Sequence, residues 1–307
     1  MRQKLISTKM KIVLLILLLL SITLYASGCI VLVQSGYKIS DYSAEIKNLT
    51  HYDLEQYLDY NHFNFNFNSS SLSSSHEIND NINGIEMNFT AQDINVVSDS
   101  GKDLIVEIKS NHTINEALPI TENNNKLTIS TNYDTPKSAS ILIRIPESYN
   151  KGGIKIITSS GNIQVSNLYL QSLNTSTASG DTYISNINSD YLNVSSSSGE
   201  INFSEIKNNL ESKITSTSGD ISGYGNLGIL TGNSTSGSLD IKISDSLKDT
   251  SLSSTSGDIT LSFPKDTGYK IDYNTLSGEY LGSDSLSSGD ESSKITLQTL
   301  SGDIYTR

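Results

Sequence analysis

The sequence predicts an all-β fold, a right-handed parallel β-solenoid with coils of about 20 residues, behind an N-terminal membrane segment. Three observations predict it. A motif of Ser-Gly followed by a carboxylate or small polar residue and then an apolar residue or Thr occurs eight times between residues 160 and 304. Apolar residues keep fixed positions around it, and a long apolar run follows the basic N-terminus. A repeat of this length is too short to be a domain and is typical of one solenoid coil. An antiparallel β-sandwich is the alternative, because its strands also recur roughly every 8–12 residues.

The N-terminus predicts membrane attachment. Residues 1–11 are a basic segment expected in the cytoplasm, and residues 12–33 form an apolar run long enough to cross a bilayer. Everything after this run is expected on the extracytoplasmic face of a bacterial cytoplasmic membrane. Cys29, the only cysteine, follows Ala-Ser-Gly in a setting similar to a bacterial lipoprotein signal, so it is a lipidation candidate. The segment is therefore either an uncleaved transmembrane anchor or a signal or lipoprotein segment.

The rest of the chain divides into three segments. Residues 34–76 are rich in Ser and Asn and indicate a polar stalk or linker. Residues 77–153 show strand alternation without the strict motif, which predicts irregular β coils that cap the solenoid, because terminal repeats are atypical. Residues 154–307 carry the regular repeats.

The regular repeats keep the same kinds of residue around each motif glycine. The fifth residue before it is mostly apolar, the third before it is always Ser or Thr, and the second after it is apolar in seven copies. Alternate residues of a strand share a face, so these positions are expected on the inner face. A buried hydroxyl needs a partner, either the next coil's hydroxyl or the backbone of its own turn.

The motif glycines are expected to be structural turn residues, because each takes a sharp bend that a Cβ would prevent. These glycines are Gly161, Gly180, Gly199, Gly219, Gly237, Gly257, Gly278 and Gly302.

The residue after each motif glycine is usually a carboxylate. Oxygen-rich clusters suit calcium, so this column is a weak candidate for divalent-cation binding. The favoured alternative is that each side chain accepts hydrogen bonds from its own turn and faces water. Stacked like charges would repel, and the nine-residue glycine-rich repeat of calcium-binding β-rolls is missing. The candidates are Asp181, Glu200, Asp220, Asp258, Glu279 and Asp303.

The repeated segments ITSTSGDI (214–221), LSSTSGDI (252–259) and LQTLSGDI (297–304) stand behind an N-terminal membrane segment. In these repeats and their position behind a membrane segment, the chain resembles the bacterial "putative adhesin" family of β-strand-repeat surface proteins. The domain that defines this family has no known function. The resemblance covers about residues 84–307. It implies a β-solenoid with a role at the cell surface or in cell-envelope stress, and it brings no catalytic residue.

Charge and residue placement argue against several functions. The net charge of -12 repels phosphate backbones, so nucleic acid is not an expected partner. All four histidines precede the regular repeats, which leaves no base there for Ser-His-Asp chemistry. We therefore expect no cofactor and no enzyme activity. A polysaccharide-acting β-helix enzyme is the alternative, since such enzymes place carboxylates in a groove.

The sequence thus predicts a non-catalytic, membrane-tethered protein that interacts with an envelope polymer or a protein partner. Self-association is a further expectation. The final motif ends at Ile304, three residues before the end of the sequence, which leaves the last strand of a solenoid without a neighbour. An unpaired strand edge invites another strand to pair with it, so this C-terminal open edge is the predicted contact.

Overall fold

The computed structural model describes residues 70–307, apart from residues 133 and 283–284. This part of the chain contains 22 strands and no helix of a length and hydropathy that could cross a membrane. The all-β prediction is confirmed. The segments predicted at 1–11 and 12–33, Cys29, and the stalk as far as residue 69 lie outside the described residues.

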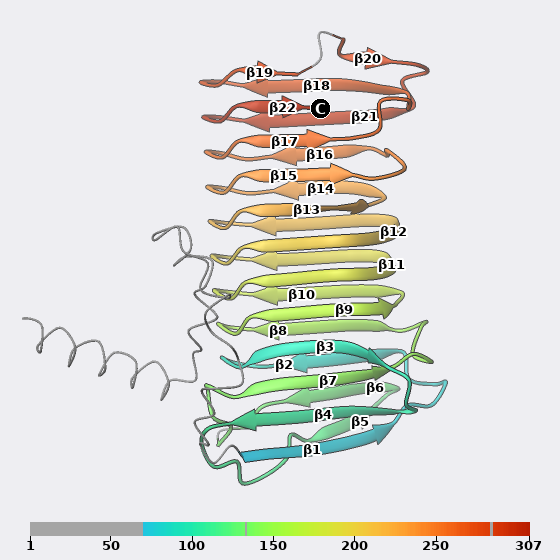
Figure 1. Ribbon diagram of the computed structural model, residues 1–307, viewed down its shortest axis with the longest axis vertical. Coiled ribbons are helices and arrows are strands. Elements are labelled where there is room, and N and C mark those ends of the chain that lie inside the picture. Colours follow the sequence, from blue (N-terminus) through green and yellow to red (C-terminus); the bar gives the residue numbers. More distant parts are fainter. Residues whose placement is uncertain (1–69, 133, 283–284) are drawn as a thin grey trace, which may run out of the picture. The chain divides into compact units, whose positions relative to one another are not determined.

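The strands stack in two ladders that share one hydrophobic core (Figure 1). In stacking order the first ladder contains β5 (Ile120–Asn123), β6 (Lys126–Ser130), β2 (Gly84–Asn88), β8 (Gly153–Thr158), β10 (Ser172–Thr177), the second halves of β11 (Thr182–Ser196) and β12 (Ile201–Ser216), β14 (Ile229–Asn233), β16 (Thr250–Ser253), β21 (Ser293–Thr299), β18 (Tyr269–Thr275) and β20 (Ser287–Ser288).

The second ladder contains β1 (Ser70–Glu77), β4 (Asp103–Ser110), β7 (Ser140–Pro146), β3 (Asp93–Asp99), β9 (Ile163–Tyr169), the first halves of β11 and β12, β13 (Ile221–Asn226), β15 (Leu239–Ile243), β17 (Ile259–Ser262), β22 (Ile304–Thr306) and β19 (Tyr280–Leu281).

The pairing identifies the architecture as a β-solenoid. All strand pairs are parallel except β1–β4, β4–β7, β5–β6 and β18–β20, which lie toward the two ends of the stack. Each coil between them adds one strand to each ladder, as parallel solenoid coils do. The antiparallel sandwich that the sequence also allowed is therefore wrong.

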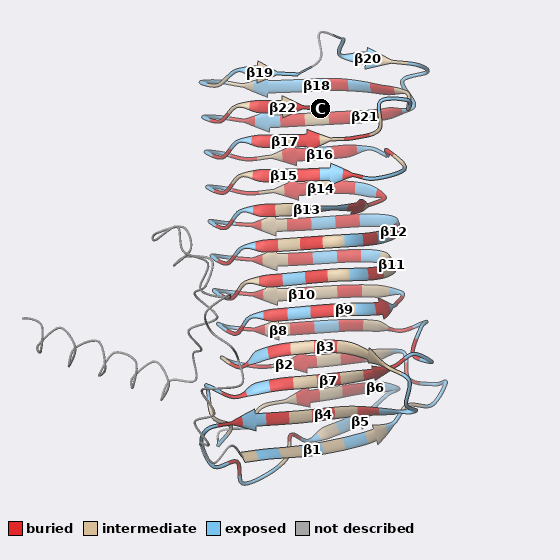
Figure 2. Cartoon of the chain, in the orientation of Figure 1, coloured by how far each residue is buried: buried red, intermediate tan, exposed pale blue. Residues whose placement is uncertain are grey.

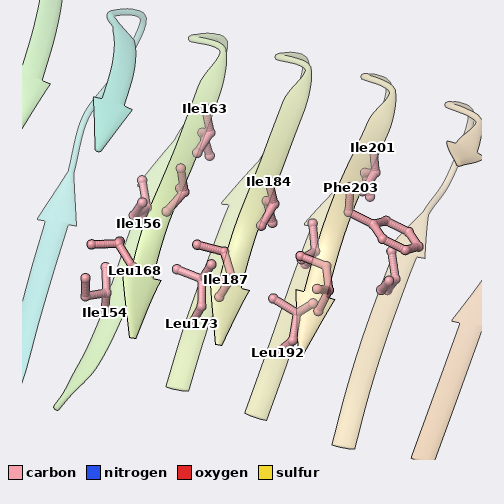
Figure 3. Close-up of a cluster of buried hydrophobic side chains, with 14 of the residues drawn as sticks. Ile154, Ile156, Ile163, Leu168, Leu173, Ile184, Ile187, Leu192, Ile201 and Phe203 are labelled. Atoms are coloured by element: carbon pink, nitrogen blue, oxygen red, sulfur yellow. The ribbon is translucent and has the colours of Figure 1, made fainter. Parts of the chain in front are cut away.

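The inner face of the coils is the one that the motif columns predicted (Figure 2). Thr175 pairs with Ile156 on one side and Val194 on the other, and all three are buried. The second residue after each glycine is also buried in seven coils, Tyr280 being half-buried. Figure 3 shows apolar side chains of successive coils, such as Ile154, Leu173 and Leu192, stacked in this core. Repeated burial of this kind is the main source of stability in a solenoid.

The N-terminal end of the stack does not follow the order of the sequence. The coil β2–β3 packs against β8–β9, while the later coil β6–β7 lies outside it. Strand β1 then pairs with β4, so residues 70–76, expected as part of the stalk, belong to the folded ladder. The Ser-rich sequence of β1 concealed this strand, because an edge strand needs few apolar residues.

The C-terminal end is also out of order, and this corrects the predicted open edge. Strand β22 lies between β17 and β19, so the last strand of the sequence has a neighbour on both sides. The coil β18–β19 forms the end of the stack instead. Its inner positions carry Tyr273 and Tyr280, whose rings stack 4.1 Å apart, whereas β21–β22 carry Leu297 and Ile304 at those positions. Two stacked tyrosines fit the end of the core better than its middle.

Candidate functional site

The motif glycines stand where one coil touches the next. A Cβ on Gly219 would lie 2.0 Å from the carbonyl oxygen of Gly199, and a Cβ on Gly199 would lie 1.9 Å from that of Gly180. The same contact recurs at all eight positions and ends at Gln92, whose carbonyl oxygen faces Gly161. None of the eight has a positive φ. These glycines are therefore required because neighbouring coils approach each other closely there, and not because of the shape of the bend.

The hydroxyl residues before the glycines bond the backbone of their own turns. In every copy the glycine N–H donates to the hydroxyl oxygen three residues earlier, over 2.8–3.3 Å. All eight hydroxyl residues were expected beside the core, and seven of them are buried, for example Ser216, whereas Thr275 is half-buried. Of the two partners that the sequence allowed, the local turn is the one found, so the column is a structural feature.

The carboxylate column links successive coils. The backbone N–H of Glu200 donates to Asp181 Oδ1 over 2.9 Å, and that of Ser238 donates to Asp220 Oδ1 over 2.7 Å. Asn162 fills the same role, because its Oδ1 accepts from the N–H of Asp181. The partner is thus the next coil rather than the residue's own turn. The remaining contacts of this kind are made by Asp93 with Asn162, by Asp258 with Asp303 and by Asp303 with Glu279.

This geometry gives no support to a cation site in the column. Among the described residues, no three His, Cys, Asp or Glu side chains come together as a metal site requires. One oxygen of each linking carboxylate already accepts a backbone hydrogen bond.

A groove of about 410 Å³ crosses the outer face of the second ladder, over strands β4, β7, β3 and β9. These strands lie side by side in Figure 1. We call this feature the β3 groove. One row of its lining residues, which we call the Asn95 row, lies in cross-strand register and contains Glu107, Leu142, Asn95, Gln164 and Tyr183.

Strand alternation turns the Asn95 row outward. In β3, the residues on either side of Asn95 are Ile94 and Val96, and both are buried in the core. A second row lies beside the first, in which Ser140 pairs with both Lys109 and Asp93. The groove is therefore lined by amides, carboxylates, one hydroxyl group, one ammonium group, one tyrosine ring and the aliphatic residues Ile94, Ile141 and Leu142.

Glu107, one of two carboxylates that line the β3 groove, is held in ion pairs. Lys109 Nζ lies 3.0 Å from Glu107 Oε1, and Arg144 Nη2 lies 3.4 Å from Oε2. The hydrogen bond from Lys109 lowers the pKa of Glu107 below its ordinary value, although burial opposes this shift. A catalytic acid needs a raised pKa, so Glu107 is not prepared to protonate a leaving group.

Asn95 presents an unpaired hydrogen-bond acceptor in the β3 groove. Its Oδ1 is buried and has no hydrogen-bond partner among the described residues. An unsatisfied buried acceptor costs about 1–3 kcal/mol. Because solvent does not reach this oxygen, a donor on a ligand can bond to it only after the Asn95 amide turns toward the groove.

Sequence reasoning missed the β3 groove. Its residues lie outside the Ser-Gly motif, and most belong to the region 77–153 that was expected only to cap the solenoid. The alternation of β3 could have identified Asn95 as outward-facing. No local signal places it between Leu142 and Gln164, because β3 is separated from β7 and β9 in the sequence.

The parallel ladders and the repeated coil contacts define the class of the protein as a β-solenoid repeat protein. Residues 82–306 match the family described as Toastrack DUF4097, and this match covers well over half of the chain. The chain therefore belongs to the Toastrack family, and the resemblance to the adhesin-type repeat family is confirmed.

Several solved structures are similar to this chain. A "putative cell adhesion protein" of Clostridium sporogenes is 14% identical over 77% of this chain and 99% of its own, with a TM-score of 0.32. A "putative adhesin" of Bacteroides fragilis is 14% identical over 78% and 97%, with a TM-score of 0.45. One of Parabacteroides merdae is 15% identical over 78% and 96%, with a TM-score of 0.42. No curated protein matches the chain.

Proposed function

We propose that the protein is a non-catalytic, membrane-tethered binding protein on the extracytoplasmic face of a bacterial membrane, with a role in adhesion or in the cell envelope. The observation that carries this proposal is the β3 groove, which exposes Tyr183 and Gln164 but holds Glu107 ionised between two cations. The apolar run at 12–33 supports the tether.

The polysaccharide-acting enzyme has less support. Hydrolysis of a glycosidic bond needs a protonated carboxyl group and a second carboxylate across the bond. The lowered pKa of Glu107 opposes the first requirement. Asp93, the other carboxylate of the groove, accepts a hydrogen bond from the backbone N–H of Asn162 over 2.9 Å. Degradation of a polysaccharide by the purified protein, lost in Glu107→Gln, would overturn the non-catalytic proposal.

Crosslinking in intact cells tests the binding role. A photo-crosslinking residue replaces Gln164, which is exposed in the β3 groove, or Lys213, which is exposed on the first ladder and serves as the control. We expect an envelope polymer or protein to be captured from position 164 and not from position 213. Equal capture from both positions, or protection of the folded part from protease added outside the cells, would refute the proposal.

The mode of attachment has its own test at Cys29. We propose an uncleaved anchor, because Ile30 to Val33 continue the apolar run beyond the cysteine. Cys29→Ser should then migrate and fractionate like the unmodified chain. Loss of fatty-acid labelling together with altered processing would identify a lipoprotein instead, with the mature chain beginning at Cys29.

A further inference from the structure

We propose that the β3 groove binds a neutral glycan built of pyranose rings, with one ring lying against Tyr183 and its hydroxyl groups bonded by the Asn95 row. This inference rests on the proposed binding function and names its ligand class. A sugar ring has a polar edge and an apolar C–H face, and the groove offers a partner for each.

Tyr183 supplies the apolar partner. Its side chain is 44% exposed at one end of the Asn95 row, so a ring face is open to a ligand. Aromatic rings combine a large apolar surface with little conformational freedom, which makes them suitable platforms. Burial, and then the nearby Asp181 and Glu200 carboxylates, raise the pKa of the Tyr183 hydroxyl, which stays protonated at neutral pH as an ordinary tyrosine does.

The amides and the carboxylate supply the polar partners. The exposed Gln164 amide can accept from one sugar hydroxyl and donate to another. Gln164 lies next to Asn95 in register, and Glu107 lies two strands away on its other side. Adjacent hydroxyl groups of one ring match such a row of fixed acceptors and donors.

Other ligand classes fit the β3 groove less well. Strands β4, β7, β3 and β9 each pair with a strand on both sides, so the groove has no free strand edge for an extended peptide. Asp93 and Glu107 would repel an anion, while Lys109 and Arg144 offset much of the attraction for a cation. A neutral ligand with both polar and apolar surface remains.

Calorimetric titration of the purified full-length protein with neutral tetrasaccharides of glucose, mannose and N-acetylglucosamine tests this proposal. We expect at least one of them to bind with one site per chain. Tyr183→Ala should weaken binding at least tenfold through loss of the ring platform, and Tyr183→Phe should retain most of it. Gln164→Met should also weaken binding at least tenfold, because Met has a similar size but no amide.

Tyr191→Ala is the matched control. Tyr191 lies in the same strand, β11, is 46% exposed, and belongs to the first ladder. The Tyr191→Ala variant should bind the sugar like the unmodified protein, and all variants should unfold at similar temperatures. Failure of every tetrasaccharide to bind at millimolar concentration, or equal effects of Tyr183→Ala and Tyr191→Ala, would overturn the glycan assignment.

The two proposals fail in different ways. Capture of a protein partner from position 164 in cells, without tetrasaccharide binding, would overturn the glycan assignment and leave the binding function standing. Absence of both capture and tetrasaccharide binding would refute both.

Discussion

At the scale of single residues, the most constrained atoms are those that one coil presents to the next. Gly219 lies in the middle of the column of motif glycines, where its coil closely approaches the coils on both sides. Gly219→Ala should lower the free energy of unfolding by about 3 kcal/mol, because the new methyl group would overlap backbone that cannot move away. The midpoint of thermal unfolding, followed by circular dichroism, measures this effect.

Gly84→Ala is the control for that change. A Cβ at Gly84 would meet only the flexible Lys126 side chain, at 3.3 Å, so we expect a change of less than about 1 kcal/mol. Equal melting temperatures for the two variants would show that the coils do not approach as closely as the structure indicates.

A second residue-scale prediction concerns the other turn of the coil. Asn167 and Asn186 have positive φ values of 60° and 50°, and Asn186 Nδ2 donates to Asn167 Oδ1 over 2.8 Å. Glu205 follows in the next coil with φ 54°, a conformation that asparagine adopts more readily. Glu205→Asn should stabilise the protein by about 0.5–1 kcal/mol, through lower backbone strain and a longer amide ladder. Glu211→Asn, at an exposed strand position, should not raise the melting temperature.

Buried hydroxyl groups without partners give the third prediction. Thr175 Oγ1 and Thr182 Oγ1 are buried in one coil and have no hydrogen-bond partner among the described residues. Valine has nearly the same shape without the hydroxyl. Thr175→Val and Thr182→Val should therefore each stabilise the protein by about 1 kcal/mol. Ser216→Ala, which removes a hydroxyl that does have a partner, should destabilise it; stabilisation by both kinds of change would contradict this explanation.

At the scale of elements, the repeat pattern predicted the coils well but not their contacts. The column of Ile163, Ile201 and Ile259 could be assigned to the core from the sequence, because the repeat places an apolar residue at the same position in each coil. The hydrogen bond from one coil to the carboxylate of the next was not predicted. It joins residues 18 to 69 positions apart, and no local pattern indicates which coil is the neighbour.

The element-scale prediction separates the structural role of the carboxylate column from cation binding. Asp220→Asn keeps an acceptor oxygen, as the natural Asn162 does, so the melting temperature should stay within about a degree or rise slightly as charge repulsion falls. Asp220→Ala removes the acceptor and should cost about 1 kcal/mol. Calcium or a chelator should leave all three proteins unchanged. A melting temperature that rises with calcium, and only when residue 220 is Asp, would restore the cation hypothesis.

At the scale of the described fold, both ends depart from the sequence order, and the sequence could not have shown this. The glycine steps suggest coils stacked in order, yet β21–β22 lie inside β18–β19. The β3 groove depends on a similar departure from sequence order. Strand β3 pairs with β7, although β4 lies between these two strands in the sequence. The order of strands at the two ends and the β3 groove therefore both depend on pairing between strands that are distant in the sequence. The central coils, in contrast, could be predicted because each repeat packs against the next one in the sequence.

The end of the stack exposes both apolar side chains and an unpaired strand edge. Leu276 is 80% exposed beside Leu300, which is 51% exposed. Strand β18 pairs with β20 only through Tyr269 and Lys270, so its later residues have no strand neighbour on the outer side among the described residues. The N–H of Ile271 points outward to Leu286, and strand alternation places the N–H of Tyr273 on the same side.

A second copy of the chain fits this edge, and self-association is the last prediction. Two β18 strands paired antiparallel about Tyr273 would place Asp272 opposite Asn274, so no like charges meet. Sedimentation of the purified full-length protein should show a concentration-dependent dimer. Leu276→Lys should weaken dimerisation at least tenfold, because a charge at an exposed edge opposes pairing. Ile229→Lys, at a 51% exposed position in the middle of the first ladder, should leave it unchanged. A full-length protein that remains monomeric at every concentration would show that the β18 edge is not a contact between copies.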